Sequence, residues 1–304
     1  MSKLRRIVMT LAAVMATAGL LSACGESSLT QSNSSSSSSQ RISQSTSSSS
    51  SSQNSTGENQ SSASSRPGNS ANFGGIDSQT IAHLASLNYQ PGQSAIVQVN
   101  NGKSTLNPNS WQTNHVIYSN LDQLNRTSSP NTAFLEARNK ANESLRVRQT
   151  VDPTGWHNNH GRTQIYNRGH MIAYSVSAGI SQTGQYDPNS VSGDQNNPKN
   201  LFTQTAFSNQ KLQTIYESKV RHAIEQGQKV IYQVTPIFRG NELMARGVNL
   251  QAVSTDGSLN FNVYIFNVQP GYSFNYQNGS SQVDQGMRVP TPVNAPRFNN
   301  QNNY

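Results

Sequence analysis

The sequence has only one cysteine, Cys24, among its 304 residues. A chain with a single cysteine has no intrachain disulfide, so its core must be stable without covalent cross-links. Charged residues are scarce at 12%, and hydrophobic residues reach only 33%. This hydrophobic share is below that of typical globular domains, which predicts that a long part of the chain is not folded. The one long apolar stretch, residues 7–21, is too short for a comfortable membrane span.

Residues 1–24 have the pattern of an export signal. Basic residues within the first six positions precede the apolar stretch, and small residues stand just before Cys24. This ending resembles the lipobox of bacterial lipoproteins. The resemblance implies cleavage before Cys24, a lipid on its thiol, and a lipid-anchored protein on the extracellular face of the bacterial cell membrane. A plain signal peptide and an uncleaved N-terminal anchor are the alternatives.

Residues 25–75 consist almost entirely of Ser, Gln, Asn, Thr and Gly. This composition buries too little apolar surface to offset conformational entropy, so a disordered Ser-rich linker is predicted, with a glycosylated stalk as the alternative. Five of the 22 Lys and Arg residues and two of the 14 Asp and Glu residues precede position 76. The remaining 17 and 12 give the rest of the chain a net charge of +5. A modest positive excess suits a polyanionic partner such as nucleic acid, although it also serves solubility.

Periodicity predicts a mixed set of elements beyond residue 76. The alternation of Leu259, Phe261, Val263 and Ile265 is typical of a strand with one buried face, and Asp256-Gly257 before it is a strong hairpin signal. Gly227 is a plausible end for the longest helix. The expected helices cover residues 78–87, 131–141 and 201–226, and the expected strands cover 95–99, a short segment after the turn at 100–102, 115–119, 164–166, 229–238, 248–254 and 259–268. Residues 281–304 are predicted to form a loose polar tail.

The segment Asn167-Arg168-Gly169-His170 follows the expected strand end at 164–166. Gly169 permits either a close backbone approach or a positive φ, which would fix the directions of its two neighbours. His170 is suited to act as a general base because a neutral imidazole accepts a proton near neutral pH. A histidine with a purely structural role is the alternative reading.

Three side chains on the helix expected over residues 201–226 suggest a functional face. Asn209 lies near the start of the apolar stripe, where a packing helix rarely places a carboxamide. Glu217 and Arg221 are four residues apart and therefore neighbours, and Asn209 is about 80° from Glu217 on an ideal helical wheel. The helix would then present an amide oxygen, a carboxylate and a guanidinium toward one cleft. A solvated Glu217–Arg221 surface pair is the alternative.

Two histidines, His157 and His160, lie in the polar segment before this motif. Zinc binding is one interpretation, but no further Cys or His stands at ligand spacing. Loop histidines on a nucleic-acid-binding face, or solvated ones, are the other interpretations. Trp156 is interpreted as a core residue, with a base-stacking platform as the alternative.

Several motifs together resemble those of the DNA/RNA non-specific endonucleases, of the bacterial DNA-entry nuclease type within the ββα-metal (His-Me finger) nucleases. The resemblance implies an α+β fold in which a ββα-metal core lies on a mostly antiparallel sheet with flanking helices, and a nuclease domain spanning residues 76–280. The residues that carry it are Thr154-Gly155-Trp156-His157, Asn167-Arg168-Gly169-His170, Asn197-Pro198-Lys199-Asn200, Gln204-Thr205-Ala206, Ser208-Asn209-Gln210 and Tyr216-Glu217-Ser218-Lys219-Val220-Arg221.

By that resemblance the enzyme hydrolyses phosphodiester bonds of DNA, with RNA as a further candidate, to 5′-phosphate ends. His170 is implied to activate water, and Asn209 to bind a hydrated Mg²⁺, with Mn²⁺ as an alternative ion. Glu217 is implied to hold metal-bound water. The resemblance further implies phosphate contacts by Arg168 and Arg221, and substrate or supporting contacts by Asn167, Asn200 and Gln204.

One position departs from the family pattern, which usually begins the histidine motif with Asp where this chain has Asn167. The amide keeps the size and one acceptor but loses a negative charge, so we expect altered metal affinity or pH optimum with activity retained. Two other classes of function stay open. They are a non-catalytic surface lipoprotein that binds extracellular DNA, and a toxin domain paired with an immunity protein.

Overall fold

The computed structural model describes residues 73–141, 147–161, 163–190 and 195–297. The expected signal peptide, Cys24 and most of the Ser-rich linker therefore lie outside the described residues. None of the helices within these ranges is long and apolar enough to cross a bilayer.

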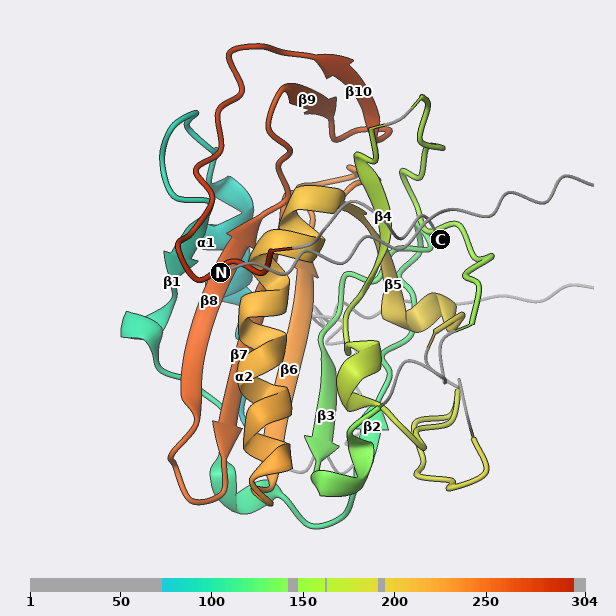
Figure 1. Cartoon of the computed structure of the whole chain (residues 1–304), viewed down its shortest axis with the longest axis vertical. Coiled ribbons are helices and arrows are strands. Elements are labelled where there is room, and N and C mark those ends of the chain that lie inside the picture. The colour runs from blue at the N-terminus through green and yellow to red at the C-terminus, as the bar shows by residue number, and fades with distance from the viewer. Residues whose placement is uncertain (1–72, 142–146, 162, 191–194, 298–304) are drawn as a thin grey trace, which may run out of the picture. The chain divides into compact units, whose positions relative to one another are not determined.

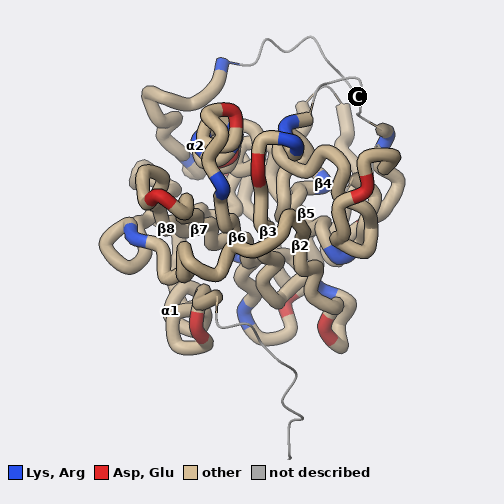
Figure 2. The backbone as a smooth tube through the Cα atoms, turned by 90° about the horizontal axis from the view of Figure 1, so that it is seen from below, with Lys and Arg blue, Asp and Glu red and all other residues tan. Residues whose placement is uncertain are grey.

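A six-stranded antiparallel sheet forms the centre of the described fold, in the order β1-β8-β7-β6-β3-β2 (Figure 1). None of its strands contains Asp, Glu, Lys or Arg, and these residues lie almost entirely in loops and helices (Figure 2). The absence of charge lets the central strands be buried on both faces. The strands are β1 Ile96–Gln98, β2 His115–Ile117, β3 Asn131–Leu135, β6 Val230–Ile237, β7 Gly247–Ser254 and β8 Asn260–Phe266.

Successive side chains along a strand point to opposite faces of the sheet, and both faces of this sheet are covered by other parts of the chain. On one side Phe134, Ile231 and Val253 pack with Leu106. On the other, their strand neighbours pack against the long helix α2, Thr214–Glu225, which crosses in front of the sheet in Figure 1. A shorter helix, α1 (Ser78–Ser86), packs against β6 and begins as predicted, with Asp77 accepting a hydrogen bond from the Thr80 amide.

A second pair of strands, β4 (Tyr166–His170) and β5 (Leu201–Thr205), lies beside the main sheet and leads directly into the α2 region. Asn267 fastens this pair to the sheet. Its Oδ1 accepts a hydrogen bond from the Thr205 amide at 2.7 Å, and its Nδ2 donates to the carbonyls of Thr203 and Ala245 at 3.0 Å. The strand pair and the helix thus form a ββα unit with a fixed position on the sheet.

A small hairpin completes the described fold. It consists of β9 (Tyr272–Asn275) and β10 (Ser280–Val283), which pair antiparallel and lie near the start of β4. Residues 281–283 therefore belong to a strand and not to the predicted loose tail. The chain stays packed beyond them, since Val289 is buried and the Arg288 carbonyl accepts a hydrogen bond from the Gly92 amide.

Two helix predictions were wrong in part. Residues 131–135 form β3, because Thr132 and Phe134 favour extended backbone and the segment pairs with strands on both sides. Residues 201–205 form β5 rather than the first turns of a helix, because they pair with β4. The histidine motif also lies within β4 instead of following it, and the segment after the 100–102 turn forms only an isolated bridge between Gly74 and Leu106. The α+β class with a mostly antiparallel sheet is confirmed.

Candidate active site

Strands β4 and β5 bring the histidine motif against the second polar motif. Asn167 lies directly opposite Gln204, and His170 opposite Leu201. Gly169 faces the Gln204 side chain so closely that an added Cβ would lie 2.3 Å from Gln204 Oε1. Its φ is not in the left-handed region, so a close approach is the reason for glycine at this position.

Gln213 connects the strand that carries the histidine to the helix that carries the carboxylate. Its Nε2 donates to the His170 carbonyl at 2.9 Å and to Glu217 Oε1 at 2.7 Å, and its Oε1 accepts from Gln204 Nε2 at 2.9 Å. Gln213 and Gln204 are fully buried. The bridge therefore fixes His170 and Glu217 relative to each other. Burial, and then the negative charge of Glu217, raise the pKa of the buried Tyr232 hydroxyl.

Asn209 lies in a π-helical segment, Ser208–Gln213, that precedes α2. Short π segments in helices are frequent at functional sites. The Asn209 backbone carbonyl accepts a hydrogen bond from Thr214 Oγ1 at 3.0 Å, whereas its half-buried carboxamide has no hydrogen bond to any described residue. An amide oxygen without a hydrogen-bond partner among the described residues, two turns before a carboxylate, fits the oxygen-rich and partly hydrated environment that Mg²⁺ prefers. The donor set present thus fits a hydrated divalent cation held by Asn209 and, through water, by Glu217.

Asn200 fixes the backbone immediately after His170 through hydrogen bonds. Its carboxamide accepts from the Ile172 amide at 2.8 Å and donates to the Ile172 carbonyl at 3.0 Å, and its own carbonyl accepts from the Met171 amide. Asn200 and Gln204 have no exposed surface. These two residues lie beneath the site, where they support it without access to a substrate. Asn167 is 9% exposed, and its buried Oδ1 has no hydrogen-bond partner among the described residues.

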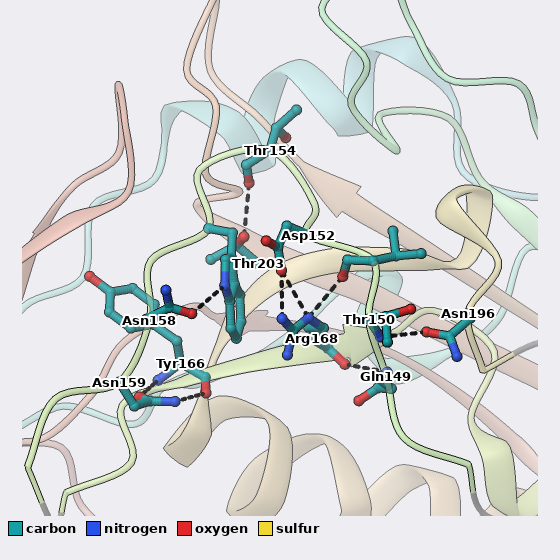
Figure 3. Close-up of polar contacts among 12 residues, drawn as sticks. Gln149, Thr150, Asp152, Thr154, Asn158, Asn159, Tyr166, Arg168, Asn196 and Thr203 are labelled. Atoms are coloured by element: carbon teal, nitrogen blue, oxygen red, sulfur yellow. Dashed lines mark hydrogen bonds and ion pairs between the residues drawn. The ribbon is translucent and has the colours of Figure 1, made fainter. Parts of the chain in front are cut away.

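Arg168 is half-buried and held from three sides (Figure 3). Its Nε donates to the Val151 carbonyl at 2.8 Å, and its Nη2 lies 2.5 Å from Asp152 Oδ1. Its Cζ lies 4.2 Å from the centre of the Trp156 ring, a cation–π contact. Trp156 is itself half-buried and forms one side of this arginine's environment. The guanidinium is thus preorganised, with an exposed carboxylate as its partner.

Arg221 is exposed on α2, one turn after Glu217. Its Nε lies 3.2 Å from Glu225 Oε1, and Lys140 Nζ lies 3.0 Å from the same oxygen. The hydrogen bond from Lys140, followed by the charges of both cations, lowers the pKa of Glu225. The predicted Glu217–Arg221 neighbourhood on the helix is present, but the ion pair of Arg221 is with Glu225. Among the described residues, the hydrogen bonds of Gln213 connect β4 to Glu217 and not to Arg221.

A polar side chain beside His170, that of Gln149, was not predicted from the sequence. Gln149 Nε2 lies 3.4 Å from His170 Nε2 and donates to the Arg168 carbonyl at 3.2 Å and the Gln195 carbonyl at 3.3 Å. The Thr150 amide, next along the chain, donates to Asn196 Oδ1 at 2.7 Å (Figure 3). The only signal in the sequence was the run of carboxamides at 195–197, and nothing marked Gln149.

The two histidines considered as a zinc pair lie in the loop before β4. His157 Nε2 is 3.0 Å from the Asn278 carbonyl, and the His157 ring lies 5.9 Å from the Tyr166 ring. Both histidines are exposed, and both line a surface pocket.

The family model for DNA/RNA non-specific endonuclease matches residues 103–256. The crystal structure of NucA from Streptococcus agalactiae with magnesium ion bound is 31% identical, covers 68% of this chain and 95% of that chain, and has a TM-score of 0.55. The structure of the same protein with no metal bound gives 31% identity, the same coverage and a TM-score of 0.54.

A curated protein also matches. It is a deoxyribonuclease from Streptococcus dysgalactiae subsp. equisimilis, 38% identical over 64 residues. The match covers 21% of this chain and only 18% of that relative's length.

Proposed function

This chain belongs to the DNA/RNA non-specific endonuclease family, and from that premise we propose a Mg²⁺-dependent enzyme that cuts DNA to 5′-phosphate ends at the cell surface. Family membership makes the chain a nuclease with the ββα-metal fold and a nucleic acid substrate. The proposal adds the identity of the ion, the roles of the residues and the location. It also adds RNA as a second substrate and a nuclease domain that spans residues 76–280.

The Gln213 bridge carries the assignment of the site. One buried carboxamide binds both the backbone of His170 and the carboxylate of Glu217, so a general base and an acidic side chain are held in one rigid unit. Preorganised groups of this kind lose little entropy when a substrate binds.

His170 acts as the general base in this proposal and takes a proton from the water that attacks phosphorus. Asn209 and Glu217 would hold Mg²⁺, the first through its amide oxygen and the second through water. When bound, the ion supplies charge that stabilises the leaving 3′ oxygen. The magnesium in the S. agalactiae NucA structure supports this choice of ion, and Mn²⁺ is the alternative.

Arg168 and Arg221 are proposed to bind the phosphate and offset charge on its nonbridging oxygens. Arg168 is presented by β4 two residues before the base, and its exposed partner Asp152 occupies the guanidinium edge that a phosphate would take. Asn167 on β4, Gln204 on β5 and Asn200 in the turn before β5 support the site. Because such contacts reach phosphate and not base edges, cleavage should depend little on sequence and strongly on salt.

The location rests on residues outside those described. We propose that the chain is cleaved before Cys24, which removes residues 1–23, that lipid is attached to Cys24, and that residues 25–75 tether the enzyme to the extracellular face of the membrane. Wild-type protein should partition with detergent and Cys24→Ala protein with the aqueous phase. Equal partitioning would contradict the lipid anchor and favour a plain signal peptide.

Plasmid degradation with Mg²⁺, with and without EDTA, tests the mechanism. His170→Ala should lower kcat by about 100- to 10,000-fold, the range of general acid–base catalysis. Asn209→Ala should raise the Mg²⁺ concentration required for half-maximal rate. The matched controls are His222→Ala on the exposed side of α2 and Gln210→Ala in the same π-helical segment, and both should retain activity.

Two outcomes would contradict the mechanism. Cutting that survives EDTA would exclude the metal requirement, and undiminished cutting by His170→Ala would exclude that residue as the base. Binding of plasmid DNA without any cutting by the wild-type protein would instead favour a DNA-binding lipoprotein.

A further inference from the structure

A pocket of about 330 Å³ lies between residues 157, 158, 160 and 163 of the segment before β4, the start of β4 and the β9–β10 hairpin. This volume is at the lower end for small-molecule sites. A second pocket of about 290 Å³ adjoins it over the hairpin, and Ser280 and Ser281 line both. The two pockets are similar in size and share these two serines.

The walls of these pockets have a distinctive chemistry. Among the described residues, the first is lined by two imidazoles, two phenol rings and three hydroxyls, and no Asp or Glu lines either pocket. Imidazole N–H and hydroxyl groups donate hydrogen bonds to phosphate oxygens, and rings of Tyr and His stack on nucleobases. The residues that define the first pocket are His157, His160, Thr163, Tyr166, Tyr272 and Ser281.

The first pocket is held rigidly rather than formed by chance between loose loops. Asn159 ties the loop to β4, since its Oδ1 accepts from the amides of Ile165 and Tyr166 and its Nδ2 donates to the Tyr166 carbonyl. The opposite wall is fixed by the Tyr166 hydroxyl, which donates to the Gly279 carbonyl at 2.7 Å. At Gly279 the hairpin turn approaches Gly155 so closely that an added Cβ would lie 1.9 Å from the Gly155 carbonyl oxygen.

The pocket is also connected to the candidate active site. Trp156 contacts the Arg168 guanidinium on one side, and its ring lies 6.2 Å from that of Tyr166, which lines the pocket. Along β4, Tyr166 is four residues from His170, which corresponds to about 13 Å. That distance equals roughly four steps of a stacked strand at 3.4 Å per nucleotide.

We propose that this pocket binds a nucleotide of the substrate strand about four positions from the bond that is cut. The proposal rests on the proposed nuclease function and adds to it an extended strand-binding site, in which the half-buried Tyr272 ring stacks on a base, the buried Tyr166 ring forms the floor, and His157, His160 and Thr163 face phosphate. Substrates too short to reach the pocket gain nothing from it.

Charge placed in the pocket tests this proposal. Thr163 is exposed, has no hydrogen bond to any described residue and lines the first pocket, so Thr163→Asp adds a carboxylate without removing an internal contact. Thr163→Asn is the matched neutral variant. The full protein is titrated with a 12-nucleotide single strand in EDTA, where it binds without cutting, at one fixed salt concentration. The Kd of Thr163→Asp should exceed that of Thr163→Asn by about fivefold or more, the effect of one lost stacking or phosphate contact.

Removing the imidazoles gives a second measurement. The His157→Ala/His160→Ala double variant should weaken strand binding to a similar extent, and His83→Ala on the exposed side of α1 should not. With Mg²⁺ present, both pocket variants should lose at least fivefold more activity on the 12-nucleotide strand than on bis(p-nitrophenyl) phosphate. That small diester places nothing in the pocket.

The outcomes are separable. Equal Kd values for Thr163→Asp and Thr163→Asn, or equal losses on the long and the small substrate, would overturn the pocket proposal. Wild-type protein that binds the strand as described but cuts neither substrate would overturn the proposed catalytic mechanism and still support the pocket.

Discussion

Replacement of Gln213 by methionine is the sharpest test of how the site is held. Methionine has a similar length and is flexible enough to fill the space, so the change removes hydrogen bonds without leaving a large cavity. Three bonds disappear, to the His170 carbonyl, to Glu217 and from Gln204. The Gln204 amide keeps its bond to Ser208 Oγ.

The magnitude follows from these contacts. Two neutral hydrogen bonds contribute about 1 kcal/mol each and one to a carboxylate about 1.5–3 kcal/mol, so unfolding should become easier by roughly 3.5–5 kcal/mol. A typical domain has about 5–15 kcal/mol of stability, so Gln213→Met should still fold. Its urea midpoint should fall by roughly 1–3 M. If His170 and Glu217 then move by about 1 Å, kcat should fall about 100-fold.

Gln210→Met is the matched control, because Gln210 lies in the same π-helical segment and makes one exposed hydrogen bond, to Gln164. It should change the midpoint and kcat little. Both variants are measured by urea unfolding and by kcat at saturating DNA and Mg²⁺. A Gln213→Met protein with the lowered midpoint but the wild-type kcat would refute the reasoning, since the bridge would then stabilise the fold without positioning the site.

Two further variants examine charge near the site. Asn167→Asp adds a carboxylate to the ββα unit that carries Asn209. The Mg²⁺ concentration for half-maximal rate should therefore fall about threefold or more and the pH optimum should rise, with activity retained. An unchanged metal titration and pH profile would contradict this. Asp152→Asn removes the carboxylate that pairs with Arg168 and so frees the guanidinium for phosphate. Because the Asp152 side chain is 57% exposed, the KM for DNA should fall only about two- to fivefold. A KM equal to that of the wild type would be the contrary result.

The main sheet was largely predictable, because its strands carry signals within themselves. Leu259, Phe261, Val263 and Ile265 alternate, and Asp256-Gly257 marks the hairpin that joins β7 and β8. Strand β3 was not predictable in the same way. Its five residues pair with Val230–Val234, about a hundred positions later, so its conformation depends on contacts that no local pattern contains.

The site was predictable as a set of residues but not as an arrangement. His170 and Asn209 could be selected from motifs, whereas the wheel that placed Asn209 about 80° from Glu217 assumed a regular α-helix, and the π-helical segment breaks that geometry. Gln213 carried no signal that set it apart from its neighbours in a polar run. Gln149 reaches His170 from a loop whose Thr150 amide is bonded to Asn196, a contact between segments 46 residues apart.

The frame that surrounds His170 and Glu217 is built from carboxamides: Gln149, Asn200, Gln204 and Gln213. Amide side chains neither gain nor lose a proton over the ordinary pH range. Acidification or alkalinisation therefore leaves this frame electrically unchanged, whereas carboxylate and ammonium supports would switch on and off. The pH dependence of the rate should accordingly report the ionisation of the reacting groups themselves, with no contribution from these four supporting side chains.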